Sequence, residues 1–137
     1  MTFRCFVKGD PKPKGSKRAF VVKGRPVLVE GNKDTRSWEF LLAETFNAKL
    51  ESVEDWIPAP FADAVEVTLV FQLRRPKAAK KRLWPHVRPD VDKLCRAVLD
   101  ALVRAGVIRD DCQVVGLCAE KRYADVPGVQ VEVRKLG

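Results

Sequence analysis

The apolar and polar positions along the chain alternate in blocks that predict strands separated by helices. Residues 3–7 alternate weakly and predict a first strand. Residues 65–71 alternate more strictly and are rich in valine, so this strand should bury one face against the rest of the protein. The side chains on that face are Val65, Val67, Leu69 and Phe71.

Four further segments have the composition of strands. Residues 19–23 and 26–30 flank Gly24-Arg25 and predict a short hairpin, because glycine-containing pairs favour tight turns. Residues 114–123 and 129–133 predict two closing strands, which a turn containing proline and glycine connects. Together with the first two strands, this pattern predicts a mixed sheet of about five or six strands.

Two segments place apolar residues three and four positions apart, which is the spacing of one helix face. The first helix begins near Asp34 or Thr35, either of which is a suitable N-cap, and ends before Pro58. The second spans residues 90–104, and Gly106 is suited to its C-cap. The apolar positions are Trp38, Leu41, Leu42, Thr45, Phe46 and Leu50 on the first helix, and Val91, Leu94, Val98, Ala101 and Leu102 on the second.

These elements predict one α+β domain over residues 1–137, in which a mixed α/β arrangement of sheet and two main helices encloses a core. The four cysteines form no C-x-x-C pair and only one histidine is present, so reduced thiols are favoured over structural zinc. No window approaches the roughly 18 apolar residues of a membrane span, and the N-terminus lacks the apolar core of a signal peptide. We therefore expect a cytoplasmic, intracellular protein without membrane contact.

Lysine and arginine outnumber aspartate and glutamate by 26 to 18, which gives a formal net charge of +8. This excess favours a polyanionic partner, above all nucleic acid. The basic residues concentrate in residues 9–18 and in residues 74–88, which contain no acid between Arg74 and Arg88. Each run alone is equally consistent with a solvated surface, but the two together favour phosphate contacts. The candidate DNA-binding residues are Lys12, Lys14, Lys17, Arg18, Lys80, Lys81, Arg82, Trp84 and Arg88.

The second basic run contains an aromatic residue, Trp84, beside Pro85 and His86. An indole ring in such a loop is able to stack on a base or to open a branched duplex, and it is equally able to anchor the loop to the body of the protein. For His86, the single histidine, the sequence favours a structural role in the loop over a catalytic role.

Four carboxylates bracket the second helix, with Asp90 and Asp92 at its start and Asp110 and Asp111 just past its end. One explanation is structural: Asp90 caps the helix, and the later pair forms a turn with side-chain hydrogen bonds to the backbone. That explanation leaves Asp100 unaccounted for. The other explanation is a divalent-cation site, because hard cations take carboxylate oxygens and phosphodiester cleavage often uses such ions.

Residues 88–115 combine these acids with the apolar helix spacing, a glycine turn and Gln113. The segment closely resembles the signature of RusA-type Holliday junction resolvases, in which a D-x-D-N/K-L-x-K-A-x-x-D-A-L helix leads through a glycine turn to D-D-x-Q-V/I. The run P-K-P-K-G-S-K-R at residues 11–18 resembles the basic P-x-K-G-R loop of that family. Lys121 falls where a downstream strand lysine is usual.

The resemblance implies a RusA-like fold and an endonuclease that resolves four-way DNA junctions by paired symmetric nicks, in recombination and repair. It implies Mg²⁺ as the cofactor, with Mn²⁺ as a substitute, and branched DNA as the substrate. Two symmetric cuts require two sites related by two-fold symmetry, so a homodimer is expected. By resemblance the metal ligands are Asp90, Asp92 and Asp111, with Asp110 and Asp100 as supporting candidates.

Two positions depart from the family pattern. Lys93 stands where asparagine is frequent, and Arg96 stands where a functional lysine is usual. Arginine neutralises a phosphate well but does not readily give up a proton. Stabilisation of the transition-state charge is therefore assigned to Arg96, Lys93 or Lys121. The rival hypothesis is a non-catalytic protein that binds or captures junctions, in which the acids serve only as caps and turns.

Overall fold

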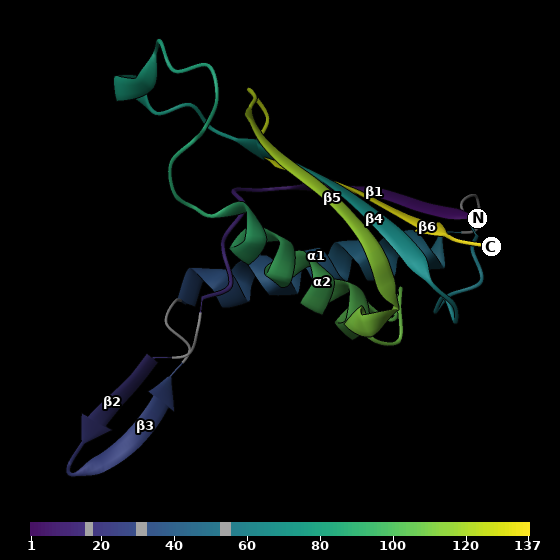
Figure 1. Cartoon of the computed structure of the whole chain (residues 1–137), viewed down its shortest axis with the longest axis horizontal. Coiled ribbons are helices and arrows are strands. Elements are labelled where there is room, and N and C mark those ends of the chain that lie inside the picture. Colours follow the sequence, from purple (N-terminus) through teal and green to yellow (C-terminus); the bar gives the residue numbers. More distant parts are fainter. Residues whose placement is uncertain (16–17, 30–32, 53–55) are drawn as a thin grey trace.

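The computed structural model describes residues 1–15, 18–29, 33–52 and 56–137 of the chain. Its main sheet has four strands in the order β1 (Thr2–Lys8), β6 (Gly128–Lys135), β4 (Val65–Leu73) and β5 (Val114–Tyr123) (Figure 1). β4 runs antiparallel to β6 and parallel to β5, so the sheet is mixed, as the sequence predicts. Two helices, α1 (Lys33–Glu51) and α2 (Val91–Ala105), cover one face of it.

The predicted hairpin is present but does not belong to this sheet. β2 (Arg18–Val22) and β3 (Arg25–Val29) pair with each other in a separate two-stranded sheet. Their turn is Lys23-Gly24 rather than Gly24-Arg25, and both residues have positive φ, as tight hairpin turns require. The main sheet therefore has four strands instead of five or six, because an alternating pattern identifies a strand but not the sheet that it joins.

The covered face of the sheet shares one core with both helices. Alternate residues of β4 from Val65 to Phe71 are fully buried, which confirms the face predicted from the alternation. Leu41, at the edge of the apolar stripe of α1, remains 38% exposed. The helices contribute Trp38, Leu42 and Phe46 from α1 and Leu94, Val98 and Leu102 from α2.

The ends of α2 agree with the sequence to within one residue. The helix begins directly after Asp90, whose backbone is extended, and ends at Gly106. Gly106 has a φ of 81°, and its N–H donates to the carbonyl oxygens of Leu102 and Val103. A left-handed glycine that satisfies the last carbonyls is the common way to end a helix, so the predicted C-cap is confirmed.

The start of α1 differs from the prediction. The helix begins at Lys33, so Asp34 and Thr35 lie inside its first turn rather than at the cap. Thr35 Oγ1 donates instead to the carbonyl oxygen of Pro13 at 2.9 Å. Threonine is a residue type that often caps helices, which is why the sequence predicts this role for Thr35. In the folded chain its hydroxyl group is hydrogen-bonded to the N-terminal loop instead.

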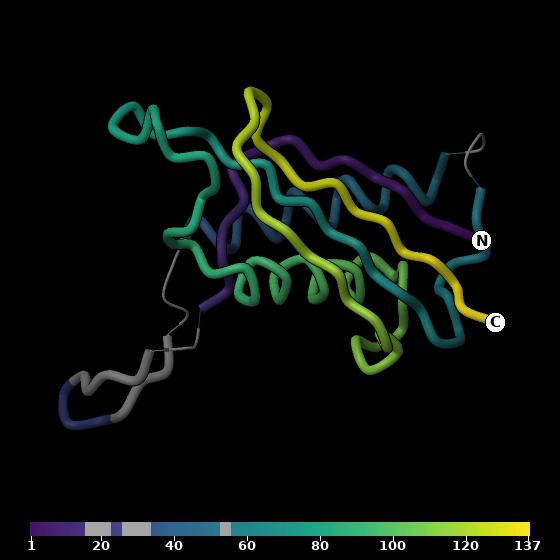
Figure 2. Tube along the Cα trace, turned by 45° about the horizontal axis from the view of Figure 1, so that its top comes forward, coloured from purple at the N-terminus to yellow at the C-terminus, as the bar shows by residue number. Residues whose placement is uncertain are grey.

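The chain direction places the start of α2 and the end of β5 at the same end of the molecule (Figures 1 and 2). A short 3₁₀ turn, η2 (Asp111–Gln113), connects α2 to β5 at the opposite end. Another, η1 (Lys77–Ala79), lies in the loop between β4 and α2. Within the described ranges, none of the helices has the length and apolar character that a bilayer span needs.

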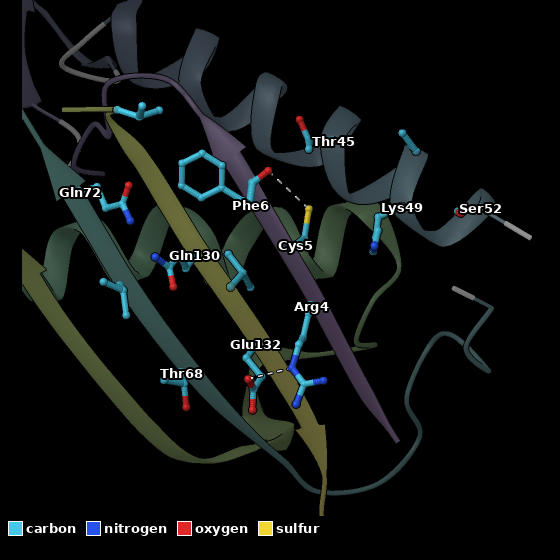
Figure 3. A pocket seen from close by; sticks show the side chains of 14 residues that line it. Arg4, Cys5, Phe6, Thr45, Lys49, Ser52, Thr68, Gln72, Gln130 and Glu132 are labelled. Atoms are coloured by element: carbon cyan, nitrogen blue, oxygen red, sulfur yellow. Dashed lines mark hydrogen bonds and ion pairs between the residues drawn. The ribbon is translucent and has the colours of Figure 1, made fainter. Parts of the chain in front are cut away.

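In the part of the chain that the structure describes, the second face of the sheet has no helix over it (Figure 1). A hollow of about 1010 Å³ is lined by residues of this face, of β1 and of the C-terminal part of α1. Figure 3 shows the side chains that line it. None of the acids that the sequence selects as candidate ligands lines this hollow. Opposite charges are paired on this face, in Arg4–Glu132, Arg134–Glu66 and Arg122–Glu120.

Candidate active site

The first two acids stand at the beginning of α2 with their carboxylates accessible. Asp90 occupies the N-cap position, but its side chain accepts no capping hydrogen bond from the helix. Its Oδ2 lies 3.5 Å from Nζ of Lys93, and about half of its side chain is exposed. Asp92 lies exposed in the first turn. The side-chain oxygens of Asp90 therefore do not cap the helix, and both carboxylates are accessible to a cation.

Cationic groups surround these two acids. Arg88 and Lys93 line a surface hollow of about 440 Å³ together with Pro13, Pro89 and Asp90. Arg96 follows Asp92 by four residues and therefore lies on the same side of α2. It is exposed, and among the described residues it makes neither an ion pair nor a hydrogen bond. Its guanidinium group is thus available to a phosphate.

Lys121 reaches this end of α2 from β5. Its Nζ donates to the carbonyl oxygens of Val87 and Pro89, each at 2.8 Å. Pro89 directly precedes Asp90, so the ammonium group holds the backbone that leads into the first acid. Two of the three N–H groups of the lysine are occupied in this way, which suits Lys121 to positioning the acid more than to contacting the phosphate.

The second acidic pair forms a capped turn at the other end of α2. Asp110 Oδ1 accepts the N–H of Cys112 at 2.9 Å, and the side chain of Gln113 accepts the N–H of Asp110 in return. The Cys112 N–H lowers the pKa of Asp110, whereas interaction with the neighbouring Asp110 carboxyl raises the pKa of Asp111. Both carboxylates are exposed, but Asp110 caps the turn, whereas the side chain of Asp111 takes no part in the cap.

One chain does not bring the two acidic groups together. α2 has 15 residues, and at about 1.5 Å per residue it separates its two ends by roughly 22 Å. Among the described residues, no three His, Cys, Asp or Glu side chains lie close enough to hold one metal ion. The predicted ligands Asp90 and Asp92 are neighbours, whereas Asp110 and Asp111 lie at the far end of the same helix.

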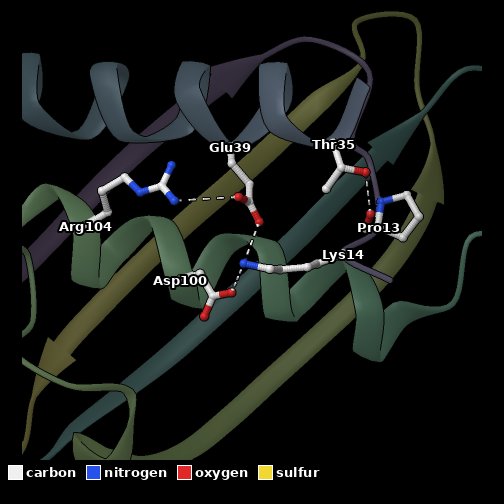
Figure 4. A network of polar contacts seen from close by, with 6 residues as sticks. All are labelled: Pro13, Lys14, Thr35, Glu39, Asp100 and Arg104. Carbon is white, nitrogen blue, oxygen red and sulfur yellow. Dashed lines mark hydrogen bonds and ion pairs between the residues drawn. The ribbon is translucent and has the colours of Figure 1, made fainter. Parts of the chain in front are cut away.

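Asp100 and Lys14 are committed to an internal network (Figure 4). Lys14 Nζ lies 2.7 Å from Asp100 Oδ2 and 3.2 Å from Glu39 Oε1, and Arg104 approaches Glu39 at 3.9 Å. The hydrogen bond to Asp100 raises the pKa of Lys14. Glu39 is only 3% exposed, and a buried carboxylate needs such cationic partners. Asp100 is therefore explained without a metal, and Lys14 fits poorly as the phosphate contact that the sequence suggests.

The network also fixes the N-terminal loop against the start of α2. The backbone N–H of Lys14 donates to the carbonyl oxygen of Lys93 at 3.0 Å. Lys12, on the same loop, is half-buried. Of the other predicted contacts from this segment, Lys17 lies outside the described residues, and Arg18 is the first residue of β2. Lys12 is thus the remaining described side chain of the loop that can meet DNA.

The loop between β4 and α2 is folded onto the end of β5. The guanidinium of Arg75 lies 4.4 Å from the ring centroid of Tyr123, a cation–π contact. Arg82 Nη1 donates to the Tyr123 hydroxyl at 3.1 Å. Arg82 is thus partly committed, whereas Lys80 and Lys81 are exposed.

Beyond Arg82 the same loop exposes the indole of Trp84, of which 55% is accessible, while Pro85 is buried. Pro85, rather than Trp84, therefore anchors this stretch to the protein. His86 Nδ1 lies 3.0 Å from the carbonyl oxygen of Trp84, a contact that agrees with its predicted structural role. Arg88, the last cation before α2, is exposed.

The salt dependence of DNA binding should show whether the exposed lysines of this loop contact phosphates. Each phosphate contact contributes a slope of about −0.9 to log K against log salt, so the double substitution Lys80→Gln, Lys81→Gln should flatten the slope by up to about two such contacts. Fluorescence anisotropy of a labelled junction over a salt series measures it. Arg4→Gln with Arg134→Gln, on the uncovered sheet face, is the matched control and should leave the slope unchanged. An unaltered slope in the lysine variant would mean that the loop is merely solvated.

Gln113 is a site residue to which the sequence reasoning gave no role. Its Oε1 accepts the N–H groups of Arg109 and Asp110 at 2.6 and 2.9 Å, and its Nε2 donates to the carbonyl oxygens of Phe61 and Asp63 at 2.7 and 2.9 Å. The signal was present in the motif, because Gln113 is the glutamine that follows the acidic pair in the signature.

Comparison with known proteins agrees with the resemblance found in the sequence. The family model described as "Endodeoxyribonuclease RusA" matches residues 9–134. The protein named "Uncharacterized protein YqaN" of Bacillus subtilis (strain 168) is 40% identical over 137 residues, which cover 95% of this chain and 94% of that protein. The match to the family model includes both acidic groups, both basic segments and Gln113.

Proposed function

This chain belongs to the RusA endodeoxyribonuclease family, and from that premise we propose that it resolves four-way DNA junctions by paired, metal-dependent nicks. The observation that carries the proposal is the start of α2, where two accessible carboxylates lie among Arg88, Lys93 and Arg96. Acids alone would repel DNA, and cations alone would bind it without cleaving it. Acids and cations together are suited to metal-assisted cleavage of a phosphodiester, because the acids can bind the metal ion and the cations can bind the phosphate.

The donor set at this end of α2 fits a hard divalent cation such as Mg²⁺, with Mn²⁺ as a substitute. Asp90 and Asp92 offer carboxylate oxygens, and those of Asp90 are not engaged in helix capping. Asp90 and Asp92 would hold such an ion, and when bound it would supply a water of lowered pKa and a positive charge beside the scissile phosphate. Arg96 would offset the charge that develops on the phosphate, with Lys93 as its alternative. Lys121 would keep Asp90 in place through Pro89.

We place the third ligand, Asp111, in the site of a second copy of the chain. The outward side of α2 carries Leu99 and Val103, both partly exposed, on the same arc as Asp92 and Arg96. Two α2 helices that pack antiparallel through this arc, about a two-fold axis near Leu99, would bring Asp111 of each copy beside Asp90 and Asp92 of the other. The proposed homodimer would then complete two sites at once, as paired cuts require.

The strand beside α2 offers further apolar area to such a contact. Val115 is 65% exposed and Leu117 is 48% exposed, and both lie on β5, an edge strand of the main sheet. Exposed apolar side chains that gather on one side of a protein commonly mark an interface. We propose that they extend the dimer contact from α2 onto β5.

A cleavage assay tests the proposed function directly. Purified protein is incubated with an end-labelled four-way junction, with Mg²⁺ or with EDTA, and a linear duplex of the same sequence is the control. We expect paired nicks at symmetric positions, in the presence of Mg²⁺ and on the junction alone. Tight junction binding without nicks at any Mg²⁺ or Mn²⁺ concentration would favour the rival, a non-catalytic protein that captures junctions.

A further inference from the structure

The side-chain amide of Gln113 uses its full hydrogen-bonding capacity on backbone groups. A primary amide offers two N–H donors and one oxygen that accepts two bonds. In Gln113 both donors reach carbonyl oxygens, of Phe61 and Asp63, and the oxygen accepts two N–H groups, of Arg109 and Asp110. Four backbone groups from two distant segments therefore meet at one side chain.

These bonds connect the acidic turn to the segment that precedes β4. The backbone on both sides of the turn is also held, because Phe61 N donates to the Val107 carbonyl oxygen at 2.9 Å, Phe61 bridges Ile108, and Val114 of β5 pairs with Val65 of β4. Beyond Ile108, toward Asp111, the turn leaves the core. Between these two anchors, Gln113 connects the part of the turn that carries the acids to the body of the protein through its side chain.

The turn has little apolar packing to hold it in place. None of the residues of η2 is buried, and Arg109 and Asp110 are exposed as well. Asp110 caps the turn through Cys112, but that bond is internal to the turn and does not fix it to the rest of the chain. Among the described residues, the four bonds of Gln113 are the side-chain hydrogen bonds that attach this turn to the rest of the chain.

We propose that Gln113 is a positioning residue for metal binding, which holds Asp111 at the orientation that a cation requires. It would touch neither the metal nor DNA and would act through the backbone of residues 109–111. This inference rests on the proposed function, in which Asp111 is a metal ligand. Residues that orient metal ligands commonly change metal affinity or activity by about 10- to 100-fold when they are replaced.

The test measures Mn²⁺ binding by titration calorimetry in the full-length protein, without DNA. Gln113→Leu removes all four bonds without adding charge, and Gln113→Glu keeps the size and an acceptor oxygen for the two N–H groups but loses both donors. We expect the dissociation constant for Mn²⁺ to rise about 10-fold or more in the leucine variant and by less in the glutamate variant. Gln130→Glu, on β6 and exposed, is the matched control for the added charge and should bind Mn²⁺ as the native protein does.

Two further measurements separate positioning from a purely structural role. Amide hydrogen exchange of Arg109 and Asp110 should accelerate in the leucine variant, and metal-free junction binding should remain within about twofold of native, since the basic loops are untouched. A Gln113→Leu protein with faster exchange but native Mn²⁺ affinity would overturn the inference. If that variant does not fold, the glutamate variant decides by the same criterion.

The failure of the proposed function has a different signature. Asp111→Asn that binds Mn²⁺ as tightly as the native protein would show that Asp111 is not a ligand, and both proposals would then fall. If Asp111→Asn weakens Mn²⁺ binding while Gln113→Leu does not, only the positioning role is lost.

Discussion

Replacing Asp90, Asp92 or Asp111 by asparagine is expected to abolish junction cleavage while junction binding stays as tight as in the native protein or becomes tighter. Each change removes a carboxylate ligand and also removes a negative charge that repels phosphate. Single-turnover nicking and anisotropy on the same labelled junction measure the two effects separately. Asp125→Asn, an exposed acid in the turn between β5 and β6, is the control and should cut normally. If a variant that carries all three substitutions still cleaves junctions at the native rate, the metal-site assignment is refuted.

Mixing two inactive variants distinguishes a site shared between copies from a site within one chain. A heterodimer of Asp92→Asn with Asp111→Asn contains one site with both substitutions and one native site, if each site takes Asp111 from the partner. Such a heterodimer should nick one strand of a junction, although each parent homodimer is inactive. Differently tagged chains, coexpressed and purified through both tags, supply it.

The mixed dimer has a clear opposite outcome. If each chain forms its own site, both sites of the heterodimer carry one substitution and no nick appears. The separation of Asp90 and Asp111 by the length of α2 is the reason to expect the single nick. Persistent inactivity of a verified heterodimer would require Asp111 to reach Asp90 by a rearrangement within the chain.

Arg96→Ala is expected to slow single-turnover cleavage by about 10² to 10³, the usual effect of removing one electrostatic donor from a transition state. The guanidinium is exposed and lies on the same side of α2 as Asp92, and Asp100 pairs with Lys14 rather than with Arg96. Arg96→Lys keeps the positive charge and should retain substantial activity. Saturating protein removes any contribution from weaker binding.

Arg4→Ala is the matched control for this substitution, because Arg4 is exposed on the uncovered sheet face. It should leave the single-turnover rate unchanged. A near-native rate for Arg96→Ala would remove Arg96 from the chemistry and transfer its role to Lys93, whose Nζ already lies 3.5 Å from Asp90. A weak Arg96→Lys enzyme would instead indicate that the planar, two-pronged geometry of arginine is needed.

Much of the fold followed from periodicity, and the misassigned parts share one cause. The alternation of Val65, Val67, Leu69 and Phe71 and the boundaries of α2 were predicted correctly, because burial of one face and a C-cap glycine are local signals. Partnership between elements is not a local signal. The pattern therefore identified β2 and β3 but could not show that they pair apart from the main sheet.

The candidate site shows the same division between residue type and partner. Lys14 and Arg82 belong to basic runs in the sequence. In the folded chain Lys14 pairs with Asp100 and Glu39. Arg82 donates a hydrogen bond to Tyr123. Sequence reasoning counts charges but cannot tell which are already neutralised. The sequence pattern also predicted that four acids near one helix form one site. It did not take into account that the helix itself keeps the first two acids far from the last two.

The paired charges on the uncovered face of the sheet reduce the contribution of that face to the electric field of the protein. Three arginines there are balanced by three glutamates, so these six residues add nothing to the net charge of +8. Positive charge is concentrated in residues 74–88 of the loop before α2, which contain no acid and in which Lys80, Lys81 and Arg88 are exposed. A molecule with such an uneven distribution of charge is turned by the field of DNA before the two touch. Its first collisions are thus biased toward the side that carries Asp90 and Asp92, and orientation becomes a part of the association rate.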